Sequence, residues 1–150
     1  MADKVTVRIE GIEKTISNLK SWQVIKTEAT KTALKETGFK TEGDAKRNCP
    51  VDTGRLRASL STNWAGSPLS YGRTSAKAKM NDGVGRPMGK PGLVVAVGTN
   101  VEYAPYVHFG TARVLKWGGY RLMAGRAFLA MAYHKNEPEL ERRIKKIFKK

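Results

Sequence analysis

The stretch from residue 12 to residue 33, IEKTISNLKSWQVIKTEATKTA, decides the fold class because it has the pattern of one long helix. Its apolar residues recur every three or four positions, so they share one stripe of a helix, while most of the lysines fall elsewhere. We predict that this stripe packs into the protein core. The stripe consists of Ile12, Ile16, Leu19, Trp22, Ile25, Ala29 and Ala33.

The predicted helix continues less certainly towards Asn48 and ends before Pro50. Gly38 and Gly43 each weaken a helix by up to ~1 kcal/mol, and proline cannot continue one. On the other side, residues 5–10 alternate between apolar and polar side chains and end at Gly11. This alternation predicts a half-buried strand that precedes the helix.

The remaining elements are shorter. Residues 60–65 could form a strand, and residues 54–59 fit either a short helix or an extended entry to it. The apolar run at 93–97 lies between two glycines and is typical of a strand buried on both faces, so we place the centre of the sheet there. Residues 103–109 predict a short helix with Pro105 in its first turn.

The chain closes with a basic helix at about 127–148, which Pro138 kinks or restarts. Glycines interrupt the sequence between Thr111 and Arg126. We therefore predict one α+β domain spanning residues 1–150. A small mixed or antiparallel sheet would be packed by the long N-terminal helix and the C-terminal helix.

Length and composition favour a single domain with its own core. The chain has 150 residues, of which 40% are hydrophobic, enough to bury a core without metal or disulfides. Cys49 is the only cysteine, which excludes an internal disulfide or a CxxC metal site, and we expect a buried structural thiol. The sequence shows neither a membrane-spanning apolar run nor a signal peptide, so we expect a soluble protein made inside the cell.

The excess of basic residues indicates partners that carry negative charge. There are 28 Lys and Arg residues against 13 Asp and Glu, a formal net charge of +15 that rises towards the C-terminus. Such a charge makes copies repel one another and attracts phosphate or acidic protein surfaces. Residues 66–92 are rich in glycine, proline and basic residues and predict a long, flexible basic loop, which is either merely solubilising or becomes ordered on assembly.

The residues needed for catalysis are scarce. His108 and His134 are the only histidines and neither has a partner at metal-ligand spacing, so we interpret both as ordinary packed or hydrogen-bonded residues. The stretch at 83–91 superficially resembles a phosphate-binding loop, but its glycine spacing fits neither known pattern and Pro91 follows Lys90. We predict no catalytic residue, no cofactor and no metal site.

Three segments together resemble a known family. They are NCPVDTGRLRASL at 48–60, VGTNVEYAPYVHFGT at 97–111 and GRAFL at 125–129. They are similar to the head-to-tail joining proteins of tailed bacteriophages, a neck or tail-completion family of lambdoid-type siphophages. The chain departs from that pattern in having His108 where the family often has Glu, and Ala127 where it often has Pro.

The resemblance implies a virion structural protein without enzymatic activity. Several copies, six or twelve, would form a ring in the phage neck between the capsid connector or head-closure proteins and the tail terminator or tail tube proteins. The protein would lie in the virion and, during assembly, in the host cytoplasm, with no membrane contact. DNA passing through the ring would be a further contact.

Candidate interface residues come mainly from the three matched segments. The aromatic residues could anchor the short helix against the sheet or a neighbour, and Trp117 and Tyr120 could be core or, as we favour, interface anchors, because glycines surround them. The full set of subunit or partner interface candidates is Asp52, Thr53, Gly54, Arg55, Leu56, Tyr103, Tyr106, His108, Phe109, Gly110, Thr111, Trp117, Tyr120, Arg126 and Phe128.

The basic residues of the loop and of the last helix are candidates for contact with DNA or with an acidic partner, or else they only keep the protein soluble. An alternative function is therefore a small basic DNA-binding or architectural protein. The sequence shows no recognition helix for the DNA major groove and no regular set of aromatic residues on which bases could stack, so it does not favour that alternative. These basic candidates are Arg73, Lys77, Lys79, Arg86, Lys90, Arg142, Arg143, Lys145, Lys146, Lys149 and Lys150.

Overall fold

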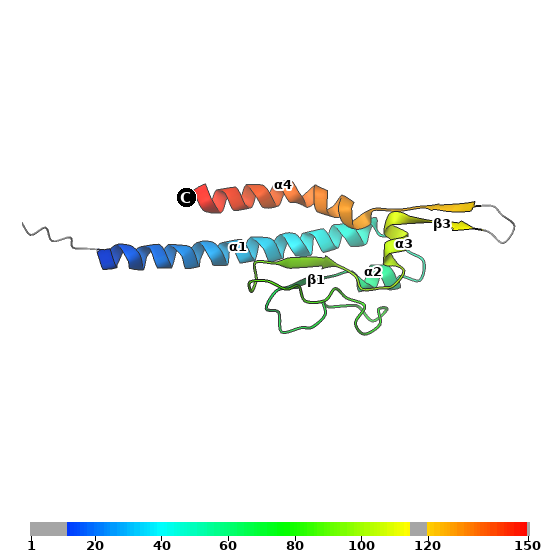
Figure 1. Cartoon of the computed structure of the whole chain (residues 1–150), viewed down its shortest axis with the longest axis horizontal. Coiled ribbons are helices and arrows are strands. Elements are labelled where there is room, and N and C mark those ends of the chain that lie inside the picture. The colour runs from blue at the N-terminus through cyan, green and yellow to red at the C-terminus, as the bar shows by residue number, and fades with distance from the viewer. Residues whose placement is uncertain (1–11, 115–119, 150) are drawn as a thin grey trace, which may run out of the picture.

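A computed structural model describes residues 12–114 and 120–149, and it confirms the α+β class. The long helix α1 (Ile12–Asn48) forms the spine of the molecule (Figure 1). Helix α4 (Phe128–Lys149) lies along the C-terminal half of α1, and the two strands β1 (Ser61–Trp64) and β2 (Val95–Gly98) pack against α1 as well. The predicted strand at 5–10 and Trp117 lie outside the described residues.

Helices α1 and α4 run antiparallel and are joined through Asp44. The carboxylate of Asp44 is buried and accepts hydrogen bonds from Asn136 Nδ2 at 2.9 Å and from Lys135 Nζ at 3.0 Å. Further along, Lys40 pairs with Glu139, and Arg143 bonds to Glu36. Polar contacts thus fix the register of the two helices over about two and a half turns of α1.

Gly38 lets the sheet approach α1 closely. A Cβ atom at this position would lie 2.7 Å from Val95 Cγ1 and 3.0 Å from Thr62 Cγ2, so no larger residue fits. Thr62 Oγ1 also donates a hydrogen bond to Glu42 Oε2 at 2.7 Å. The helix runs unbroken through Gly38 and Gly43, and at Gly38 the close contact with the sheet compensates for the lower helix propensity of glycine.

The prediction of a strand buried on both faces is wrong. Among the described residues, strand β2 pairs with β1 alone, in an antiparallel register from Ser61 opposite Gly98 to Trp64 opposite Val95. Its residues Val95, Ala96 and Val97 are half-buried. A short apolar run has the same sequence pattern in a two-stranded sheet with one covered face as in the centre of a large sheet.

Among the stripe residues whose side chains the structure describes, the core prediction for α1 is correct only near the middle of the helix, and the Ile12 and Ile16 side chains lie outside that description. Ala33 is buried, whereas Leu19 is 61% exposed and Ile25 is 66% exposed. The reason is that α4 ends beside this part of α1, where Lys26 lies over the Phe148 ring, so α1 extends beyond it (Figure 1). Helical periodicity shows which residues share a face but not whether another element covers that face.

The segment at 66–92 contains no helix or named strand and folds back on the β1–β2 sheet. Isolated bridges join Tyr71 to Gly85 and Gly83 to Thr99. Gly83 is buried, and its backbone lies so close to the Ser61 hydroxyl that a Cβ atom would be 2.8 Å from it. The middle of this basic segment is thus held by the rest of the chain.

Two short helices and a hairpin complete the described fold. Helix α2 (Arg55–Ser59) decides the alternative left open at residues 54–59 in favour of a short helix. Helix α3 (Ala104–Phe109) is the short helix predicted there, with Pro105 in its first turn. Strands β3 (Gly110–Val114) and β4 (Tyr120–Ala124) form an antiparallel hairpin that projects from the body (Figure 1). The sequence analysis missed this hairpin.

The core lies where α1, α2, α3 and the start of α4 meet. Its largest residue is Phe128, which is 1% exposed, and Leu56, Leu60 and Cys49 surround it. Burial raises the pKa of the Cys49 thiol, and the predicted buried thiol is confirmed.

Helix α4 continues through Pro138 as one helix. None of the described helices is long and apolar enough to cross a membrane.

Candidate subunit interface

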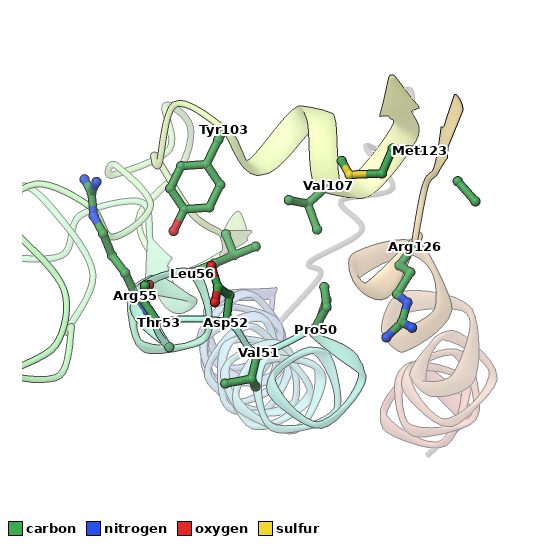
Figure 2. Close-up of a pocket in the computed structure, with 12 residues that line it drawn as sticks. Pro50, Val51, Asp52, Thr53, Arg55, Leu56, Tyr103, Val107, Met123 and Arg126 are labelled. Carbon is green, nitrogen blue, oxygen red and sulfur yellow. Dashed lines mark hydrogen bonds between the residues drawn. The ribbon is translucent and has the colours of Figure 1, made fainter. Parts of the chain in front are cut away.

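A groove of about 940 Å³ lies between the end of α1, helix α3 and the base of the hairpin (Figure 2). Tyr103, Val107 and Met123 form one wall, and Pro50, Val51 and Arg126 lie across from them. The floor includes Leu56, which belongs to the core. The full lining is Pro50, Val51, Asp52, Thr53, Gly54, Arg55, Leu56, Tyr103, Val107, Met123, Ala124 and Arg126.

The side of the groove that contains Pro50 and Val51 follows from the way in which α1 ends. The last helical bond runs from Cys49 N to Ala45 O at 2.9 Å, and Pro50 then prevents another turn. Gly54 has φ +83°, in the left-handed region that favours glycine, and its carbonyl accepts the first bond of α2 from Ala58 N at 2.9 Å. The sequence PVDTG is therefore a sharp connection that exposes the side chains of residues 51–53.

The opposite wall, formed by Tyr103, Val107 and Met123, depends on a close backbone contact between Gly110 and Gly125. A Cβ atom at Gly110 would lie 2.4 Å from Met123 O and 2.6 Å from Gly125 N, so the hairpin crosses α3 at backbone contact. Arg126 N donates to Val107 O at 2.9 Å, which brings the start of α4 under α3. The glycines of two matched segments thus meet at the base of the hairpin.

Helix α3 carries a row of exposed aromatic side chains next to the groove. Tyr103, Tyr106 and Phe109 are three residues apart, so they share one face, and they are 37%, 59% and 81% exposed. They do not pack against the sheet, one of the two positions expected for them. Met123 on β4 is half exposed as well. Exposed aromatic and Met side chains around a concavity are typical of protein interfaces.

The groove is connected to the basic loop through Arg55. Its guanidinium points away from the groove (Figure 2) and binds Asp82 with two bonds, Nε to Oδ2 at 2.8 Å and Nη2 to Oδ1 at 2.7 Å. Asp82 is buried and also accepts a bond from Lys79 N at 2.7 Å. The Arg55 bonds hold the pKa of the Asp82 carboxyl below its usual value.

Some interface candidates lie elsewhere. Phe128 and Leu56 are buried core residues, and Leu56 also forms part of the groove floor. Their place at a subunit interface stays a prediction. The ring of His108 packs edge-on against Phe109 and Phe128, which agrees with its interpretation as a packed residue, although its Nδ1 has no hydrogen-bond partner among the described residues.

The other candidates lie on the hairpin and its flanks. Thr111 is half-buried in β3, and Tyr120 is the first residue of β4. The sequence analysis missed Met123 and Ala124 as groove residues. The pair Gly118-Gly119 between two runs that can form strands was the available signal for a hairpin.

The basic candidates do not form one surface. Those of the loop lie on the far side of α1 from α4, which carries the others (Figure 1). Several are already engaged: Arg86 donates to Ser67 O at 2.6 Å, Arg143 pairs with Glu36 and Glu139, and Lys145 pairs with Glu141. Lys150 lies outside the described residues.

The groove has the features of a binding surface between proteins. Among residues 12–114 and 120–149, no group of His, Cys, Asp and Glu is arranged to hold a metal ion. The groove offers exposed aromatic and apolar side chains. These features define a small α+β subunit with a surface suited to association.

A family model described as "Bacteriophage HK97-gp10, putative tail-component" matches residues 11–110, and the chain belongs to this family. The match covers 100 of the 150 residues and includes most of the groove. The protein is thus a structural component of the phage tail region. No curated protein and no solved structure gave a significant match.

Proposed function

We propose that this protein is a non-enzymatic subunit of the phage neck, where several copies form a ring that joins the DNA-filled capsid connector to the tail. The observation that carries the proposal is the groove with its row of exposed aromatic residues on α3. Two of the three segments that resemble joining proteins form most of its lining, and the third contributes Arg126. Family membership supports the structural role in the virion.

The aromatic row is well placed for contact with another subunit or a neck partner. Large exposed aromatic side chains lose little conformational freedom on binding and often contribute most of the binding energy. Tyr106 and Phe109 lie beyond the groove itself, so a partner that covers them would also reach the groove edge at Tyr103. We place the main protein contact of the subunit here.

A complementation experiment tests this role. Phage lacking the gene would be supplied with the wild-type protein or with the Tyr106→Ala/Phe109→Ala double variant, and lysates would be viewed by electron microscopy. We expect the variant to leave full heads and complete tails separate. The matched control is Met80→Ala/Met88→Ala, since both methionines are over 90% exposed in the loop and far from α3 in sequence.

The control should restore joined virions to the wild-type level. Equal titres for wild type and the aromatic double variant would contradict the proposal that the α3 row makes the joining contact. Because Tyr106 and Phe109 are exposed, the variant should keep its thermal midpoint, which circular dichroism would verify.

A further inference from the structure

A second concavity, of about 320 Å³, lies on the other side of the Val51–Gly54 turn and is lined by basic residues. Lys46 comes from the last turns of α1, Arg57 from α2 and Lys77 from the basic loop. We refer to it as the basic pocket. Its other lining residues are Val51, Gly54, Ala58 and Ser75, so no carboxylate lines it.

The fold holds these three cations together. Ser75 N donates to Ala58 O at 3.4 Å, which ties the loop to α2, and Ala78 N donates to Ser75 O at 2.9 Å, which closes a turn around Lys77. The Lys77 side chain lies over Gly54, with its Nζ 4.0 Å from the position that a Cβ atom would take there. Lys77 is thus positioned by backbone hydrogen bonds on both sides of the turn.

The charges of the basic pocket are only partly balanced. Lys46 pairs with Glu42 at 2.5 Å. Within the described part of the chain, neither Arg57 nor Lys77 has a carboxylate oxygen within 4.0 Å. Like charges that a fold brings together repel each other, and a bound anion removes that repulsion.

We propose that the basic pocket binds a phosphate group of the DNA backbone. Arg57 supplies a planar guanidinium that can bind two phosphate oxygens, Lys77 supplies an ammonium, and Ser75 supplies a hydroxyl. This inference rests on the proposed function, because a joining ring surrounds the path of the packaged DNA. It assigns the two sides of the Val51–Gly54 turn to different partners: the aromatic groove to protein, the basic pocket to DNA.

The test compares two double variants of the full chain. Arg57→Gln/Lys77→Gln removes two charges from the basic pocket, and Lys20→Gln/Lys26→Gln removes two charges from the N-terminal part of α1, at the other end of that helix from the pocket. Both variants have the same net charge, so long-range attraction to DNA falls equally. Binding to a fluorescent DNA duplex would be measured by anisotropy over a series of salt concentrations.

We expect the pocket variant to lose about tenfold in affinity at low salt, and its log-log salt slope to become shallower by about 0.9, the value for one lost phosphate contact. The control variant should lose no more than about twofold, because it removes only long-range attraction. Equal losses in the two variants, or none in either, would overturn the basic pocket as a phosphate site.

Polyglutamate serves as a second probe, for an acidic protein surface. Pocket-dependent binding of polyglutamate without binding of the duplex would overturn the DNA assignment. The joining role is judged separately by electron microscopy of lysates, so a variant that joins heads to tails but has lost duplex binding separates the two proposals.

Discussion

Asp82 shows how one side chain links the basic loop to the groove. Its carboxylate is buried, and it receives two bonds from Arg55 and one from Lys79 N. The carbonyl of the same residue accepts a bond from Asn100 N at 2.8 Å, just after β2. Asp82 thus joins the loop, α2 and the end of β2. Through Arg55 it also helps to hold the neighbouring Val51–Gly54 turn, which lines both the groove and the basic pocket.

Arg55→Ala should destabilise the protein clearly more than the control change below, because it leaves the buried Asp82 carboxylate without its ion-pair partner. The free energy of unfolding would be measured by urea denaturation followed by circular dichroism. The control is Arg57→Ala, two residues later, which is exposed and should change the stability by no more than about 0.5 kcal/mol. Equal effects of the two changes would contradict this account of Asp82.

This pair could not be predicted from sequence. Arg55 and Asp82 are 27 residues apart, and the loop between β1 and Asp82 has no periodicity that would fix its path. By contrast, the sequence correctly predicted that α1 ends before Pro50, because this signal depends only on the backbone geometry that proline allows.

At the scale of the elements, the packing of α4 on α1 depends on Asp44. Hydrogen bonds from Asn136 and then Lys135 hold the pKa of the Asp44 carboxyl below its usual value of 3.8, against the opposing effect of burial. The charged form is therefore favoured in the folded protein. The resulting stabilisation is fully present above pH 3.8 and is lost as the pH falls through the lower pKa of the folded state.

The Asp44→Asn variant should consequently show a weaker acid dependence than the wild type. As the pH is lowered from about 5 through 3.8, the wild-type free energy of unfolding should fall more steeply, because its Asp44 must take up a proton on unfolding. Urea titrations at several pH values, at constant ionic strength, would measure this difference. Parallel curves for the two proteins would contradict the role of Asp44.

The sequence predicted the secondary-structure elements better than the tertiary contacts that bury them. The pattern from Ile12 onwards identified α1, and the Pro105 signal identified α3. The same pattern wrongly placed Leu19 and Ile25 in the core, because their burial depends on the length of α4, an element more than 100 residues away. The groove also depends on tertiary contacts, since Met123 reaches it only through the missed hairpin.

For the whole molecule, net charge constrains assembly. Six copies at +15 each would carry +90, so closure of a ring without an oppositely charged partner is opposed by repulsion. We expect the purified protein to be monomeric at about 20 mM salt, where charges are screened only beyond roughly 20 Å. Analytical ultracentrifugation would measure the assembly state. Stable closed rings at low salt without a partner would contradict the expectation that ring closure needs an oppositely charged partner.

The central claim is that this protein joins heads to tails, and deleting its gene from the encoding phage or prophage tests that claim most directly. Electron microscopy of the lysate should show DNA-filled heads and free, complete tails that accumulate separately. Normal virions would contradict the claim and favour the alternative of a DNA-binding protein. Heads accompanied by malformed or missing tails would also contradict it, and would place the protein one step earlier, in completion of the tail.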